Sequence, residues 1–205
     1  MPSTLVHVAF AGLISAALLG DAFDARALAV VFAVVAVPDL DAFIGLYVVG
    51  AHRAALHTLL IPAGLGLLLV YDTRVRARSA LRSRWGARGV RVTWVSLLAF
   101  VLAAIGPDLV TGGANVLYPV HDQFYRLDGQ LYLSDKHGLV QTFLDQPAEG
   151  STAQMHISSG VDAVAGPDPS SVEHVFSIAR SGTRLLVVVT SAVVVGSKLW
   201  LTRKA

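Results

Sequence analysis

The chain of 205 residues contains no cysteine. Disulfide bonds and thiolate-bound metals are therefore excluded, and any metal must be held by histidine and carboxylate side chains. Such ligands favour zinc, manganese, iron or magnesium over copper(I) or iron–sulfur clusters. A P-loop is also missing, since Thr111-Gly112-Gly113 is only a turn signal. We therefore expect no nucleotide site.

Charged residues are scarce as well, at 15% of the chain against 54% hydrophobic residues, and the mean hydropathy is +0.62. The apolar residues fall into blocks separated by polar breaks, which is typical of several membrane spans in contact with lipid. The N-terminus lacks the positive region and cleavage site of a secretory signal, so we expect the first block to remain in the protein. The fold class predicted is an all-α polytopic membrane protein.

The apolar blocks predict about five transmembrane helices. They cover residues 5–19, 27–37 with a continuation to 50, 53–71, 92–105 and 185–201. Two of these helices are expected to be short and ended by Pro-Asp, at Pro38-Asp39 and Pro107-Asp108, like the interrupted helices that form ion sites inside membranes. Each Pro-Asp taken singly is also explained as an ordinary helix stop followed by a turn.

Three regions follow from this division. Residues 1–112 are expected to form a four-span membrane domain, 113–181 an external acidic segment that could bind a protein partner, and 182–205 a fifth span with a basic tail. Within the external segment, Asp128-Gly129 between two alternating runs predicts a β-hairpin with a type I′ turn. Residues 149–171, rich in Ser, Gly, Ala and Pro, predict a mobile irregular connection.

Seven arginines crowd one short connection between apolar blocks: Arg74, Arg76, Arg78, Arg82, Arg84, Arg88 and Arg91. A nucleic-acid patch is one explanation, but a cytoplasmic loop beside anionic lipid is more typical of this position. We expect no nucleic-acid partner. With five spans, this orientation places the C-terminus in the cytoplasm and the N-terminus outside the plasma membrane.

Ionisable residues within the apolar blocks are the strongest functional signal. A helical rise of 1.5 Å per residue places four of them about 20 to 25 Å from the cytoplasmic ends of their helices: His7, Asp39, His57 and Asp108. Together with Asp41 they form a plausible nitrogen and oxygen ligand set for one or two divalent cations, with zinc or manganese preferred. A metal there would offset carboxylate burial and activate water, which is the chemistry of hydrolysis.

Two neighbouring residues, Arg53 and His52, each allow more than one role. Arg53 and His57 are four residues apart, so on a helix they share one face. Arg53 is then either an anion-binding group at the site or an interfacial anchor that reaches the headgroups, and both alternatives stay open. His52 is a ligand, a supporting donor or a proton carrier.

Three motifs together resemble the membrane-bound metal-dependent hydrolases, whose bacterial members are also described as LexA-binding, inner-membrane-associated hydrolases. They are Val37-Pro38-Asp39-Leu40-Asp41, His52-Arg53-Ala54-Ala55-Leu56-His57-Thr58 and Gly106-Pro107-Asp108-Leu109-Val110-Thr111-Gly112-Gly113. The resemblance covers roughly residues 1 to 140. It implies a metal site of His7, Asp39, Asp41, His52, His57 and Asp108 with Arg53 beside them. Thr58 and Ala54 stand where the family commonly has Ser and Gly.

The preferred hypothesis is a membrane-embedded hydrolase acting on a phosphoester or another lipid-borne ester. Its catalytic residues would be Asp39, Asp41, His52, Arg53 and His57. The alternative is a non-enzymatic membrane module, in which the same cluster is a structural ion or salt-bridge site. An ion or proton pathway ranks last, because it would need ionisable groups on both sides of the membrane midplane.

Overall fold

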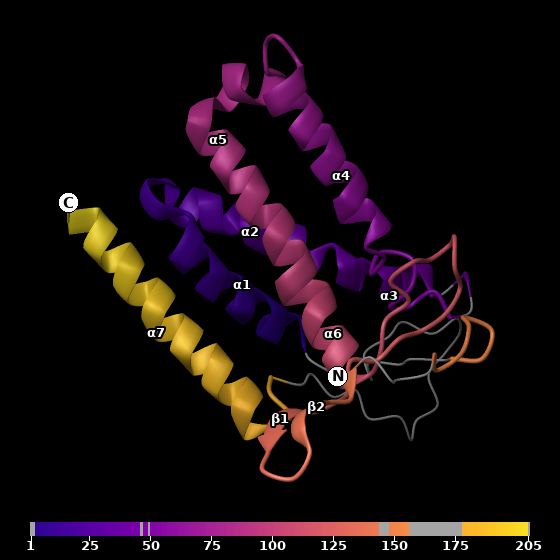
Figure 1. Cartoon of the computed structure of the whole chain (residues 1–205). Coiled ribbons are helices and arrows are strands. Elements are labelled where there is room, and N and C mark those ends of the chain that lie inside the picture. The colour runs from indigo at the N-terminus through magenta and orange to yellow at the C-terminus, as the bar shows by residue number, and fades with distance from the viewer. Residues whose placement is uncertain (1–2, 46, 49, 144–147, 156–177, 205) are drawn as a thin grey trace, which may run out of the picture.

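The computed structural model describes residues 3–45, 47–48, 50–143, 148–155 and 178–204. It is mostly helical, with one two-stranded sheet (Figure 1). The helices are α1 Thr4–Leu18, α2 Ala25–Ala36, α3 Asp41–Ile44, α4 Leu60–Val70, α5 Ala80–Ala99, α6 Gly106–Thr111 and α7 Gly182–Lys204. The strands are β1 Leu131–Ser134 and β2 Gly138–Gln141.

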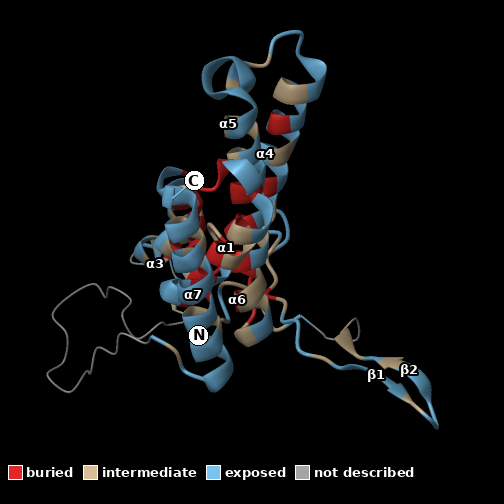
Figure 2. Cartoon of the chain, turned by 90° about the vertical axis from the view of Figure 1, so that its left-hand side faces the viewer, coloured by how far each residue is buried: buried red, intermediate tan, exposed pale blue. Residues whose placement is uncertain are grey.

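The core lies between α1, α2 and α5, and small aliphatic residues dominate it. Ala11 of α1, Val31 and Val35 of α2 and Ala99 of α5 are all fully buried there. Small side chains let the helix axes approach closely, which is how helices associate where lipid removes the hydrophobic drive between them. The buried residues accordingly form one band through the middle of the helical body (Figure 2).

Helix α7 packs against α1. A side-chain carbon at Gly12 of α1 would lie 2.7 Å from Ser191 Oγ and 3.1 Å from Val195 Cγ2, both on α7. Gly12 therefore permits a contact that a larger residue would prevent. Most of the remaining surface of α7 is apolar and exposed, as at Val193 and Leu186, which suits a helix that faces lipid.

Two helical stretches are long and apolar enough to cross a membrane, which is consistent with a membrane protein. They are Ala80–Thr111, with 32 residues, and Gly182–Lys204, with 23. A third arises if α2 and residues 38–44, bent by 40°, count as one span. Crossing a hydrocarbon core takes about 20 helical residues, whereas α1 has 15 and α4 has 11. The predicted count of five spans is not supported.

The two Pro-Asp sequences behave differently. Pro38 does interrupt the chain: α2 ends at Ala36, and a 3₁₀ turn Pro38–Leu40 leads into α3. The predicted stop at Pro107 is wrong. A π-helical turn, Phe100–Ile105, joins α5 to α6, and the helix continues to Thr111. The wider turn accommodates a proline that lacks the N–H of an α-helical residue.

The predicted helix over residues 53–71 begins only at Leu60. The preceding segment makes one local turn, in which the Ala54 and Ala55 N–H groups donate to the Ala51 carbonyl, and it also bonds to a distant part of the chain. The Asn115 N–H donates to the Arg53 carbonyl at 2.9 Å, and the Leu59 N–H donates to the Val116 carbonyl at 2.8 Å. Residues 51–59 thus form an irregular segment. The prediction that Arg53 and His57 share one helical face is wrong, because neither residue lies in a helix.

A β-hairpin is present, but its turn is not at Asp128-Gly129. Strands β1 and β2 pair in antiparallel register from Leu131↔Gln141 to Ser134↔Gly138, so the loop is 135–137. Gly138 has φ +66°, as a three-residue loop closed by a left-handed residue requires. The hairpin projects from the helical body (Figure 2). Most of the predicted mobile connection 149–171 lies outside the described residues.

Helix α1 ends and α5 begins at one end of the helical body, away from α3 and α6 (Figure 1). Arg88 of α5 pairs with Asp24 before α2, and Lys198 of α7 donates to the Ala16 carbonyl of α1. Arg91 Nη1 lies 3.4 Å from the Leu19 carbonyl. The helical body therefore has a basic end and an opposite end, where the predicted site residues lie.

Candidate metal centre

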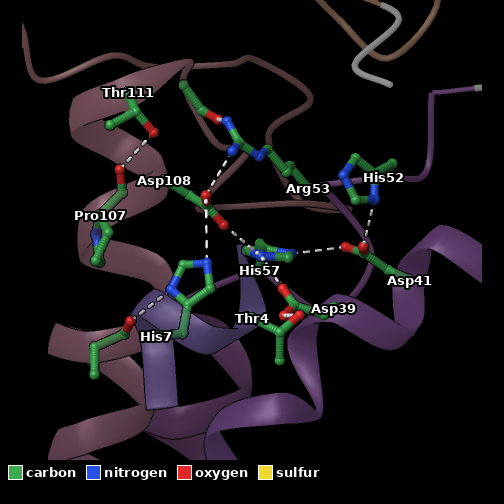
Figure 3. Close-up of polar contacts among 12 residues, drawn as sticks. Thr4, His7, Asp39, Asp41, His52, Arg53, His57, Pro107, Asp108 and Thr111 are labelled. Carbon is green, nitrogen blue, oxygen red and sulfur yellow. Dashed lines mark hydrogen bonds and ion pairs between the residues drawn. The ribbon is translucent and has the colours of Figure 1, made fainter. Parts of the chain in front are cut away.

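Four separate segments supply the cluster of ionisable residues shown in Figure 3. His7 comes from α1, and Asp39 and Asp41 come from the break after α2. His52, Arg53 and His57 belong to the irregular segment before α4, and Asp108 belongs to α6. All seven predicted residues therefore lie in one cluster, although they are spread over a hundred positions of sequence.

His7 is oriented by a carbonyl group that Pro107 leaves available. In an α-helix the Ala103 carbonyl would accept from residue 107, but Pro107 has no N–H. The His7 Nδ1 donates to this carbonyl instead, at 2.6 Å. That bond places a ring proton on Nδ1 and turns Nε2 to the cluster. Nε2 points toward Asp108, 3.7 Å from its Oδ1.

His57 bridges carboxylates from two segments. Its Nδ1 lies 2.8 Å from Asp41 Oδ2, and its Nε2 lies 2.8 Å from Asp108 Oδ2 and 3.9 Å from Asp39 Oδ1. The imidazole is only 1% exposed. His57 therefore has one nitrogen toward Asp41 and the other toward the carboxylates of Asp39 and Asp108.

Asp41 and His52 lie on the far side of His57. The second oxygen of Asp41, Oδ1, is 3.1 Å from His52 Nδ1. Asp41 is fully buried between the two imidazoles. The sequence-based ligand set included Asp41, and the resemblance added His52. The geometry places Asp41 where it orients His57, with His52 on the other side of Asp41.

Arg53 is inside the protein rather than at its surface. Its side chain is 1% exposed, with Nη2 2.5 Å from Asp108 Oδ1 and Nη1 3.3 Å from the Gly113 carbonyl. The interfacial-anchor alternative therefore does not fit. Its backbone φ of +61° is one that non-glycine residues seldom adopt, and such strain persists where surrounding contacts over-determine the conformation.

His7, Asp39 and Asp108 form a group that could hold a metal ion. Each offers one ligand atom, and these atoms lie within 4.8 Å of one another. Bonds near 2 Å allow ligand atoms to be about 4 Å apart at most, so a small inward movement would complete the site. Beside this group, the buried His57 Nε2 lies 2.8 Å from Asp108 Oδ2 but makes no aligned hydrogen bond among the described residues.

Ion pairs offer a second explanation of the same group. Arg53 and the imidazoles lie beside the carboxylates of Asp41 and Asp108, so the cluster is compatible with a structural role as well as with metal binding. Asp39 differs from its neighbours, because its side chain is 25% exposed. Solvent or substrate would therefore meet the cluster at Asp39.

Sequence reasoning missed one side chain of the cluster and two backbone contacts. Thr4 Oγ1 donates to Asp39 Oδ2, and a signal for it exists, since Thr4 lies three residues before His7 on one face of α1. The carbonyls of Ala103 and Gly113 carried no sequence signal.

Searches for relatives add no assignment: no protein-family model, curated protein or solved structure matches the chain. The resemblance to membrane-bound metal-dependent hydrolases thus rests on the motif residues themselves.

Proposed function

We propose that this chain is a membrane-embedded hydrolase that holds a divalent metal through His7, Asp39 and Asp108. One observation carries the proposal: ligand atoms from three separate segments lie within 4.8 Å of one another. The buried, unaligned Nε2 of His57 beside the two carboxylates adds support. The motifs that resemble the membrane-bound metal-dependent hydrolases point the same way. Zinc or manganese suits these ligands best.

The residues of the cluster would have different roles in hydrolysis. A divalent ion bound by such ligands polarises ester oxygens and lowers the pKa of water. Asp39 meets solvent and substrate, and Asp41 with His52 holds the ring of His57. His57 Nε2 is then the group that takes up and returns a proton. Arg53 fixes Asp108 in place, because its donors are engaged inside the protein.

The substrate class follows from the location. The cluster lies among the helices of a chain that has candidate membrane spans, so a phosphoester or another lipid-borne ester is the proposed substrate. We infer from the arginines of the 71–91 region that the basic end lies in the cytoplasm. The cluster then faces the outer side of the plasma membrane.

A second function has its own support. Arg53 and His57 place positive charge beside Asp41 and Asp108, and buried charges that are paired in this way need no metal. The cluster would then be a structural site in a non-enzymatic membrane module, whose segment 113–181 binds a partner.

Elemental analysis of protein purified in detergent separates the two functions. The first predicts zinc or manganese in the native chain and its loss in Asp39→Asn, together with loss of hydrolysis of phosphoester and carboxylic ester substrates. Thr111→Val is a matched control, since among the described residues Thr111 Oγ1 bonds only to the Pro107 carbonyl of its own helix. If the folded native chain retains no metal after incubation with either ion, the hydrolase proposal is wrong.

A further inference from the structure

A groove lies at the basic end of the molecule, between α2 and α5. Its volume is about 790 Å³, within the range of roughly 300–1,000 Å³ that ligand sites occupy. Residues 24–30 form one wall, and residues 81–93 form the other. The groove is on the opposite end of the body from the metal-binding group, so its role is independent of the proposed hydrolysis.

Each wall of the groove carries one arginine, and the carboxylate of Asp24 also lines the first wall. Arg26 lies in the first turn of α2, and Arg88 lies on α5 beyond the bend at Gly86. Arg88 pairs with Asp24, whereas within the described part of the chain Arg26 has no carboxylate at ion-pair distance. Two guanidinium groups on facing helices suit a phosphate group, which each can bind through two parallel hydrogen bonds.

The floor of the groove is apolar. Ala27, Val30 and Val92 line it below the arginines, and the Val30 side chain is 49% exposed. Trp85 stands at the mouth and is 59% exposed. Its indole lies close over the helix because Gly89 has no side chain: a Cβ there would be 2.3 Å from Trp85 Cβ. Tryptophan at such a boundary is typical of the membrane interface.

We propose that this groove binds an anionic phospholipid. The phosphate lies between Arg26 and Arg88, and an acyl chain follows the apolar floor past Val30 and Val92. Charge complementarity supports this occupant, since 20–26, 71–91 and 198–204 hold eleven of the 16 lysines and arginines but three of the 14 acidic residues. Basic pockets between membrane helices bind such headgroups. A soluble polyanion would leave the apolar floor uncovered.

Native mass spectrometry of the delipidated full chain tests the groove, with dioleoyl-phosphatidylglycerol and dioleoyl-phosphatidylcholine as probes. The anionic lipid should bind more tightly. Arg26→Gln and Arg88→Gln should each weaken its binding about fivefold, from roughly one surface arginine's electrostatic contribution. Arg78→Gln is the matched control, because Arg78 is exposed at the same end but does not line the groove.

Asp24→Asn supplies a test in the opposite direction. The amide oxygen can still accept from the Ala27 N–H, which now donates to Asp24 Oδ1 at 2.8 Å, so the cap of α2 is kept. Removal of the charge releases Arg88 and should tighten phosphatidylglycerol binding. This variant and Arg26→Gln also decide the matter if Arg88→Gln does not fold, as judged by circular dichroism.

Several results would overturn the proposal. Equal binding of the two lipids would do so. A loss of phosphatidylglycerol binding in Arg78→Gln as large as that in Arg26→Gln would also do so, because it would indicate diffuse attraction to the whole basic end. If a single-stranded oligonucleotide displaced phosphatidylglycerol at a concentration below that at which phosphatidylglycerol itself binds, the groove would be assigned to nucleic acid instead.

Discussion

Arg53 Nη2 lies 2.5 Å from Asp108 Oδ1, and both side chains are buried. The pair joins the irregular segment before α4 to α6, and the Arg53 carbonyl also accepts from the Asn115 N–H. Arg53 thus fixes the position of one proposed metal ligand from outside the ligand group.

Arg53→Gln should therefore lower the free energy of unfolding. Removing one partner of a buried ion pair leaves an uncompensated charge and costs about 3–5 kcal/mol. Denaturant or thermal unfolding in detergent measures the change. Arg126→Gln is the control, because Arg126 is 43% exposed and its pair with Glu149 lies near the surface, where such pairs contribute about 0–1 kcal/mol. Equal losses for the two variants would contradict the assigned role of Arg53.

Asp41→Asn should weaken metal binding without abolishing it. Asp41 contacts His57 and His52 rather than the proposed ion, and loss of a residue that supports a metal site from outside the ligand group typically costs about 10–100-fold in metal affinity or activity. Competition with a chelator measures the affinity, and elemental analysis at saturating metal should show unchanged stoichiometry. Complete loss of metal at saturation would instead make Asp41 a ligand.

The hydrogen bonds that Asp122 accepts from Asn115 and Thr152 should be sensitive to acid. Burial alone would raise its pKa, but hydrogen bonds donated by the Thr152 hydroxyl and N–H and by Asn115 Nδ2 lower it below the ordinary 3.8. A lowered pKa stabilises the fold above the ordinary value, and this contribution is lost as the pH falls through the folded-state pKa.

Thermal unfolding of the native chain and of Asp122→Asn across acid pH checks this. The native chain should unfold at the higher temperature near neutral pH, and the gap should close only below about pH 3.8, the unshifted value. A gap that is constant down to the lowest pH at which the protein folds would show that ionisation of Asp122 contributes nothing.

Gly12→Leu should loosen α7 from α1. The added side chain would meet Ser191 Oγ and Val195 Cγ2, and overpacking of this kind costs about 1–3 kcal/mol. Gly196→Leu on α7 is the matched control, since a Cβ there has no atom within 4 Å. Unfolding in detergent should show a lower free energy of unfolding for Gly12→Leu and no change for Gly196→Leu. Equal effects would mean that the close approach of α1 and α7 is not limiting.

The absence of cysteine makes orientation directly testable. Lys136→Cys in the hairpin and Arg78→Cys in the arginine-rich connection would each carry the single thiol of the chain. A membrane-impermeant maleimide should label the first in intact cells and the second only after permeabilisation. The reverse pattern would place the basic end outside.

The amino-acid sequence alone was enough for the membrane character, for helix α7 and for the break at Pro38, because hydropathy and proline chemistry act within a few residues. It also identified every ionisable side chain of the cluster. Charge inside an apolar block is a local feature, and it is visible without knowledge of the fold.

Only the tertiary structure decided which of these residues could hold a metal ion and which support them. Residues 51–59 leave the helical conformation because their backbone groups bond to residues 115 and 116. The hairpin turn moves to 135–137 because the Tyr125 N–H and the Leu127 N–H donate to Ala114 and Leu109 rather than to a neighbouring strand. His7, Asp39 and Asp108 come together in a group that could hold a metal ion, with Asp41 and His52 behind His57, because long-range contacts set side-chain positions that no local periodicity encodes.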